Sequence, residues 1–147
     1  MNNNTCGCNN DLNDCNNCIR EILQVICMLQ SNACPAGSLN SCDRPSLGIG
    51  PTCISCNTRP IILYTCCGNG VAWSMPTTRT ETATTSSTVF RVEKVDGCCC
   101  TCRVLAENPD TTAAETTPYV STDSFVTFNL NCCGALTCLA DTYISGV

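Results

Sequence analysis

The chain has 147 residues, 18 of them cysteine, and a formal net charge of −5 with no histidine. The lack of histidine removes Ser–His and Cys–His nucleophile pairs, and the lack of any basic run leaves nothing to neutralise nucleic-acid phosphates. A membrane-spanning helix needs about 18 consecutive apolar residues, and no apolar run in the sequence approaches that length. We therefore expect no enzyme and no cofactor, and neither nucleic acid nor membrane as a partner.

The N-terminal end is expected to be an arm followed by a helix. Residues 1–12 are rich in asparagine, carry Cys6 and Cys8, and lack the basic and apolar regions of a secretion signal. Residues 13–30 place apolar side chains at a spacing of three and four, which predicts an amphipathic helix capped by Asn13 or Asp14. The predicted buried face comprises Cys15, Cys18, Ile19, Ile22, Leu23, Ile26 and Leu29.

The remaining chain is expected to be a loop followed by short strands. Prolines and glycines in residues 31–56 favour a loop, which carries Cys34, Cys42, Cys53 and Cys56. Gly68-Asn69-Gly70 and Asp96-Gly97 indicate hairpin turns, whereas residues 77–88, rich in threonine, indicate a surface loop. Strand-like runs are residues 60–67, 71–75, 87–95, 98–106, 118–121 and 124–133.

These elements predict a mainly β fold, a β-sandwich or barrel-like antiparallel domain with an N-terminal amphipathic helix. The expected organisation is a flexible arm over residues 1–12 and a single domain over residues 13–147. Charged residues make up only 13% of the chain, about half the usual share. A surface with so little charge suits packing against copies of itself.

The stretch GCCCTC, Gly97 to Cys102, places four cysteines within five residues of a predicted strand. Successive side chains of a strand point to opposite faces, so Cys99 is expected on one face and Cys98, Cys100 and Cys102 on the other. Same-face neighbours lie about 6–7 Å apart, whereas the Cβ atoms of a disulfide lie about 3.5–4.5 Å apart. These thiols are therefore expected to find partners elsewhere in the fold, on a metal or on another chain.

Two CxxC pairs raise the alternative of a metal or redox site. The pairs Cys15–Cys18 and Cys53–Cys56 are separated by 34 residues. In a typical zinc site with two CxxC pairs the separation is only about 15–20 residues. Cys15–Cys18 lies at a helix start, where the positive end of the helix dipole lowers a thiol pKa, but no βαβ pattern surrounds it. A zinc-binding module remains the alternative function, although no residue set stands out as metal ligands.

Several segments resemble one protein family. NTRPIILYT (residues 57–65), VFRVEKVD (89–96), RVL (103–105) and VSTDSFVTFNLNCCGALTCL (120–139) are similar to the cysteine-rich spore coat and exosporium proteins of endospore-forming bacteria, the CotY/CotZ/ExsY type. The resemblance covers roughly residues 14–145. It implies a structural protein that is made in the mother-cell cytosol without a signal peptide and assembles at the spore surface, in the coat or exosporium.

The resemblance also implies how the cysteines are used. Subunits assemble with copies of themselves, and with other coat proteins, into a layer or fibre that disulfides then cross-link. Cys99, Cys132 and Cys138 fall on cysteine positions of the family. The expected cross-linking cysteines are Cys6, Cys8, Cys66, Cys67, Cys98, Cys99, Cys100, Cys102, Cys132, Cys133 and Cys138. Those expected to be buried or paired within the chain are Cys15, Cys18, Cys34, Cys42, Cys53 and Cys56.

Overall fold

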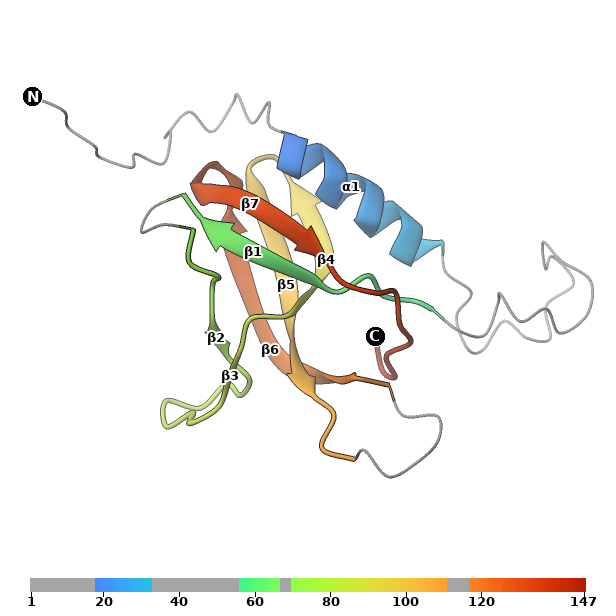
Figure 1. Cartoon of the computed structure of the whole chain (residues 1–147), viewed down its shortest axis with the longest axis vertical. Coiled ribbons are helices and arrows are strands. Elements are labelled where there is room, and N and C mark those ends of the chain that lie inside the picture. The colour runs from blue at the N-terminus through green and yellow to red at the C-terminus, as the bar shows by residue number, and fades with distance from the viewer. Residues whose placement is uncertain (1–17, 33–55, 67–69, 111–116) are drawn as a thin grey trace, which may run out of the picture.

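The computed structural model describes residues 18–32, 56–66, 70–110 and 117–147 (Figure 1). Within these ranges the chain forms one α-helix, seven strands and a short 3₁₀ turn, η2. In chain order they are α1 (Cys18–Ser31), β1 (Ile61–Thr65), β2 (Met75–Pro76), β3 (Ser86–Ser87), β4 (Phe90–Asp96), β5 (Cys99–Glu107), β6 (Tyr119–Asn129), η2 (Leu130–Cys132) and β7 (Cys133–Cys138). The predicted arm and domain boundary at residues 1–12 lies outside the described residues.

Five strands form an antiparallel sheet in the order β6-β5-β4-β1-β7, and β2 and β3 pair as a separate two-stranded ribbon. The prediction of a mainly β fold with an N-terminal helix is confirmed. The finer expectation of a sandwich or barrel is corrected, because the sheet does not close in the described part of the chain and the ribbon has only two residues per strand. The expected surface loop over residues 77–88 contains β3, the second strand of that ribbon.

The predicted hairpin between β4 and β5 is confirmed, but its turn lies one residue later than Asp96-Gly97. Asp96 is the last residue of β4 and lies opposite Cys99 of β5, so Gly97 and Cys98 form the turn, and Gly97 has a φ of +56°. After β1 the chain also returns antiparallel, because Tyr64 bridges Ala72 and the Trp73 N–H donates to the Leu63 carbonyl at 2.9 Å. Gly68 and Asn69 of that predicted turn lie outside the described residues.

Gly97→Ala is expected to destabilise the domain by about 1–2 kcal/mol, because a positive φ is costly for any residue with a Cβ. A Cβ at this position would meet nothing within 4 Å, so backbone strain is the only source of the cost. Thermal unfolding should show a decrease in Tm of about 2–8 °C. Gly97→Asn should lose less stability, because asparagine tolerates a positive φ better than alanine does. Equal losses of stability in the two variants would contradict this explanation.

The two strand-like runs at residues 118–121 and 124–133 form one strand, β6, followed by η2 and β7. Thr122 and Asp123, which separate the runs in the sequence, lie within β6, near the shift in register between Arg103 and Leu105 of β5. Asn129 ends β6 and caps η2, its side chain accepting from the Asn131 N–H. This turn sends the chain to the opposite side of the sheet, where β7 pairs with β1.

Helix α1 packs against β4 and β7 (Figure 1). Ile19, Leu23 and Ile26 are buried as predicted, but Ile22 is 45% and Leu29 52% exposed, so the predicted face was too wide. Gln30 takes the next buried position: its amide donates to the Val92 carbonyl at 2.7 Å and accepts from the Arg59 N–H at 3.0 Å. These two bonds fasten the end of the helix to the sheet. The predicted start at residues 13–17 lies outside the described residues.

The core lies between α1 and the sheet and is completed by an aromatic cluster. The Trp73 ring stacks on Phe128 with centroids 4.7 Å apart, and Phe90 meets Phe128 edge-on at 5.1 Å. Cys100 and Cys102 are wholly buried in the same core. Among the described residues, no helix has both the length and the hydrophobicity to cross a bilayer.

Candidate functional site: buried and exposed thiols

The cysteine-rich strand β5 alternates as the sequence predicts. Cys100 and Cys102 are fully buried, whereas Cys99, the first residue of the strand, is exposed. Cys98, in the turn before β5, is 4% exposed. Pairing with β4 on one side and β6 on the other holds this alternation in register. The sheet thus divides neighbouring cysteines into a core set and a surface set.

The buried thiols contact one another, contrary to the expectation from strand spacing. The Sγ atoms of Cys100 and Cys102 lie 3.5 Å apart, because the two side chains lean together across the spacing of their backbone positions. Cys133, at the start of β7, is 8% exposed and joins the same core. Side chains buried in this way cannot meet a second chain while the domain stays folded, which makes these three cysteines small apolar core residues.

The environment of Cys102 and Cys133 keeps these two thiols protonated. The hydrogen bond with Cys100, followed by burial, raises the pKa of Cys102 well above its ordinary value. Burial is also the main cause that raises the pKa of Cys133 to about 12. Because the thiolate is the nucleophile in disulfide chemistry, these groups are poor attackers near neutral pH.

Free thiols also lie at the surface, on several separate elements: Cys18, Cys56, Cys66, Cys99 and Cys138. Cys18 begins α1, Cys99 begins β5 and Cys138 ends β7. The expectation for Cys18 and Cys56 is corrected, because both are exposed free thiols rather than buried or paired ones. Cys18 faces solvent because the helix turns its row of Ile19, Leu23 and Ile26 toward the sheet instead.

The other cysteines are two that are disulfide-bonded, one that is half-buried, and those outside the described residues. Cys98 and Cys132 each take part in a disulfide bond. Cys27 belonged to neither predicted set; it is half-buried on α1, its Sγ lies 3.7 Å from the Glu93 carbonyl, and burial raises its pKa. The predicted residues outside the described part of the chain are Cys6, Cys8, Cys15, Cys34, Cys42, Cys53 and Cys67.

The positions of the described thiols can be compared with the alternative prediction of a zinc-binding module. Among the described residues, no three cysteine, aspartate or glutamate side chains come together as a set that could hold a metal ion. Cys18 and Cys56, one from each CxxC pair, are both exposed free thiols in this structure.

We expect thiol labelling of the folded, reduced protein to separate the cysteines into two classes. With a pKa of about 12, Cys133 is about 10⁻⁴ thiolate at pH 8, roughly a thousandfold less than an ordinary thiol. Alkylation followed by peptide mapping should modify Cys99 at least about a hundredfold faster than Cys133, and unfolding should remove the difference. Equal rates in the folded protein would contradict the burial described above.

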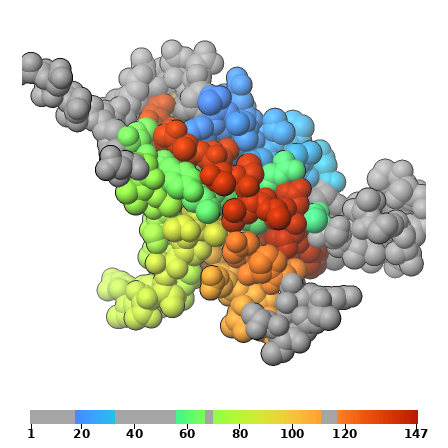
Figure 2. All heavy atoms as spheres, in the orientation of Figure 1, coloured from blue at the N-terminus to red at the C-terminus, as the bar shows by residue number. Residues whose placement is uncertain are grey.

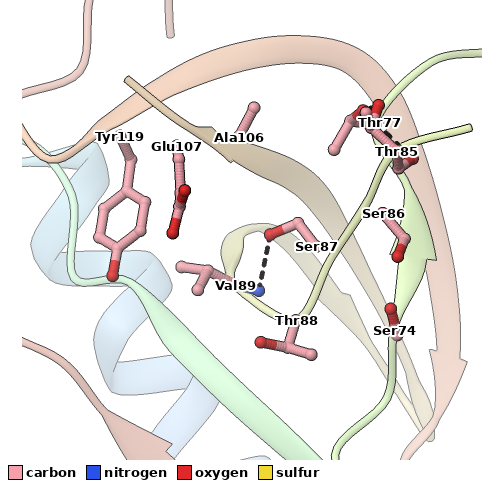
Figure 3. Close-up of a pocket in the computed structure, with 10 residues that line it drawn as sticks. All are labelled: Ser74, Thr77, Thr85, Ser86, Ser87, Thr88, Val89, Ala106, Glu107 and Tyr119. Carbon is pink, nitrogen blue, oxygen red and sulfur yellow. Dashed lines mark hydrogen bonds between the residues drawn. The ribbon is translucent and has the colours of Figure 1, made fainter. Parts of the chain in front are cut away.

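A cavity of about 570 Å³ lies between the β2–β3 ribbon and the ends of β5 and β6 (Figure 3). Glu107 and Tyr119, paired across β5 and β6, lie side by side on one wall, opposite serine and threonine hydroxyls from the ribbon. The Ser87 hydroxyl accepts from the Val89 N–H at 3.1 Å. The lining supplies hydrogen-bonding groups and one carboxylate but no lysine or arginine. Sequence reasoning missed this site because its threonines indicated only a surface loop.

One comparison with known proteins gives a match. A family model described as Spore coat protein Z matches residues 6–141, nearly the whole chain. No curated protein and no solved structure matches.

Proposed function

The chain belongs to the spore coat protein Z family, and we propose that it is a structural, non-catalytic subunit that assembles with copies of itself into a layer or fibre. Disulfides between subunits then cross-link the assembly. Membership of this family supports a location at the spore surface. We further propose synthesis in the mother-cell cytosol, oxidation after assembly, and contacts with other coat proteins.

The observation that carries this proposal is the set of exposed free thiols on separate elements of one small domain. Four of these thiols lie at four different elements: Cys18 begins α1, Cys66 follows β1, Cys99 begins β5 and Cys138 ends β7. Several surfaces of one subunit can therefore each offer a sulfur atom. A subunit with a single exposed thiol could form only a dimer, whereas one with several can propagate a network. The buried thiols are kept out of this chemistry by the core.

Two properties support association before oxidation. β6 and β7 are the outer strands of the sheet, each paired with one neighbour, and β7 (CGALTC) contains neither charge nor proline. Outer strands without such residues are templates for pairing with another chain. The low overall charge reduces repulsion between copies. Contacts of this kind would set the geometry, and disulfides would make dissociation depend on reduction.

The test is oxidation of the full chain purified with reductant. We expect a ladder of bands beyond the dimer on non-reducing gels, lost on reduction, and ordered layers or fibres by negative-stain electron microscopy. Mixing ¹⁵N-labelled with unlabelled protein before oxidation identifies the bonds between chains, because only these give disulfide-linked peptides of mixed mass. Cys99→Ser and Cys138→Ser together should thin the ladder, whereas Cys133→Ser, in the core, should leave it unchanged.

Two results would overturn the proposal. Oxidised protein that stays monomeric and carries no mixed-mass peptide would exclude cross-linking between subunits. Tight, stoichiometric zinc in protein purified without chelator, released only with loss of structure, would favour the metal-binding alternative.

A further inference from the structure

Helix α1 carries a second apolar face, beside the one that packs on the sheet. Cys18, Ile22, Val25 and Leu29 follow one another at intervals of four, three and four residues. At about 100° per residue these positions fall within an arc of about 60°, roughly a quarter turn from the buried row. Ile22 is 45%, Val25 55% and Leu29 52% exposed, and Met28, about 60° beyond this arc, is 65% exposed. We call Cys18, Ile22, Val25 and Leu29 the α1 stripe.

The chemistry around the α1 stripe argues against most partners. The charged residues of the helix are Arg20 and Glu21, both in its first turn, so residues 22–31 carry no charge. A charged macromolecule would find no complementary group there. Helices that lie on a membrane surface are rich in lysine and arginine on the polar face, and α1 has a single arginine.

The spacing of the α1 stripe matches a copy of itself. Intervals of four and three residues form the seam of two-stranded helical packing, in which each side chain fits a hole formed by the same pattern on the facing helix. A second copy of this chain carries that pattern by definition. Figure 2 shows α1 (blue) at the surface next to the last strand (red), where another subunit could approach.

The area of the α1 stripe sets the strength of such a contact. Exposed apolar side chains of this number offer about 300–400 Å² per copy, whereas a stable dimer buries about 800 Å² per partner. The stripe alone therefore supports a weak, reversible contact. A subunit that joins several neighbours needs contacts of this kind, because strong pairs would trap disordered aggregates before a regular array forms.

We propose that the α1 stripe is an interface between two copies of this chain, in which the α1 helices pack against each other. This inference rests on the proposed function and assigns one of its contacts to named residues. It also places the exposed thiol of Cys18 at the end of the interface, next to the neighbouring subunit.

The test uses full-length protein kept reduced, so that no disulfide contributes, and sedimentation velocity over a range of concentrations. Wild type should associate reversibly. Val25→Glu should weaken association at least tenfold, because each pair would bury two glutamates in an apolar seam. Gln24→Glu is the matched control: it adds the same charge at an exposed position on the neighbouring polar arc and should behave as wild type.

Mixed variants separate a true interface from a general effect of charge. Val25→Glu and Val25→Lys should each associate weakly alone, and mixing them should restore association, because opposite charges then meet across the seam. Thermal unfolding of each variant should stay close to wild type, since Val25 is more than half exposed.

The outcomes distinguish this inference from the proposed function. Three results would each overturn the α1 interface. The first is Val25→Glu that associates as strongly as wild type does, and the second is a mixture of Val25→Glu and Val25→Lys that fails to recover association. The third result is wild-type protein that stays monomeric while reduced. Any of these could occur in a protein that still forms cross-linked layers on oxidation, in which case the proposed function stands without this contact.

Discussion

Replacing Phe128 with alanine is expected to lower the free energy of unfolding by about 3–5 kcal/mol, the usual cost of a phenylalanine truncated in a core. Phe128 is 4% exposed and is the ring that joins Trp73 to Phe90, so both aromatic contacts are lost with it. It also lies opposite Cys100 across the β5–β6 pair, so the space left would adjoin that buried thiol. Chemical denaturation should show the loss, and alkylation of Cys100 should accelerate.

Phe125→Ala is the matched control for this prediction. Phe125 lies three residues earlier on the same strand, on its outer face, and is 50% exposed. Its ring has one contact of note, the Arg103 guanidinium 4.5 Å from the ring centroid, which is worth about 0.5–1 kcal/mol at such a site. If the two variants lost equal stability, the aromatic cluster would not be the centre of the core.

The sequence predicts the β5 cysteines well because strand alternation is a local property. Once residues 98–106 are recognised as a strand, the faces of Cys99 and Cys100 follow from backbone geometry. The same holds for the hairpin between β4 and β5, whose turn chemistry lies within two residues, although the turn falls at Gly97-Cys98, one residue later than predicted. The family resemblance, carried by short segments such as VFRVEKVD, agrees with the matched family model.

Features that depend on packing between distant segments were not predictable in this way. The contact between the Cys100 and Cys102 sulfur atoms depends on how two side chains lean within a packed core, and strand spacing alone suggests that they stay apart. On α1, periodicity gives one broad apolar face, but the sheet is wide enough to cover only part of it. The exposed remainder, with Ile22 and Leu29, becomes visible only when the helix is placed on β4 and β7.

Glu93→Ala is expected to destabilise the domain by about 2–4 kcal/mol, although glutamate is a residue usually tolerant of change. One carboxylate oxygen of Glu93 accepts from both Arg91, at 2.9 Å, and Arg103, at 3.0 Å. The side chains of these arginines are only 10% and 17% exposed. Removing the carboxylate leaves two largely buried positive charges without their shared partner, and breaking such a pair costs far more than the pair itself contributes.

Asp96→Ala tests whether burial, rather than charge pairing as such, sets this cost. Asp96 lies on the same strand and faces Lys94 at 3.9 Å, but the two side chains are 79% and 70% exposed, so its loss should cost less than about 0.5 kcal/mol.

Replacing Glu93, Arg91 and Arg103 together with uncharged residues of similar size should recover much of the stability lost in Glu93→Ala, because no buried charge then remains unpaired. Denaturation of the four proteins measures these differences. A triple variant less stable than Glu93→Ala would mean that the arginines stabilise the sheet through their other contacts, such as the bond from Arg91 to the Thr58 hydroxyl at 2.9 Å.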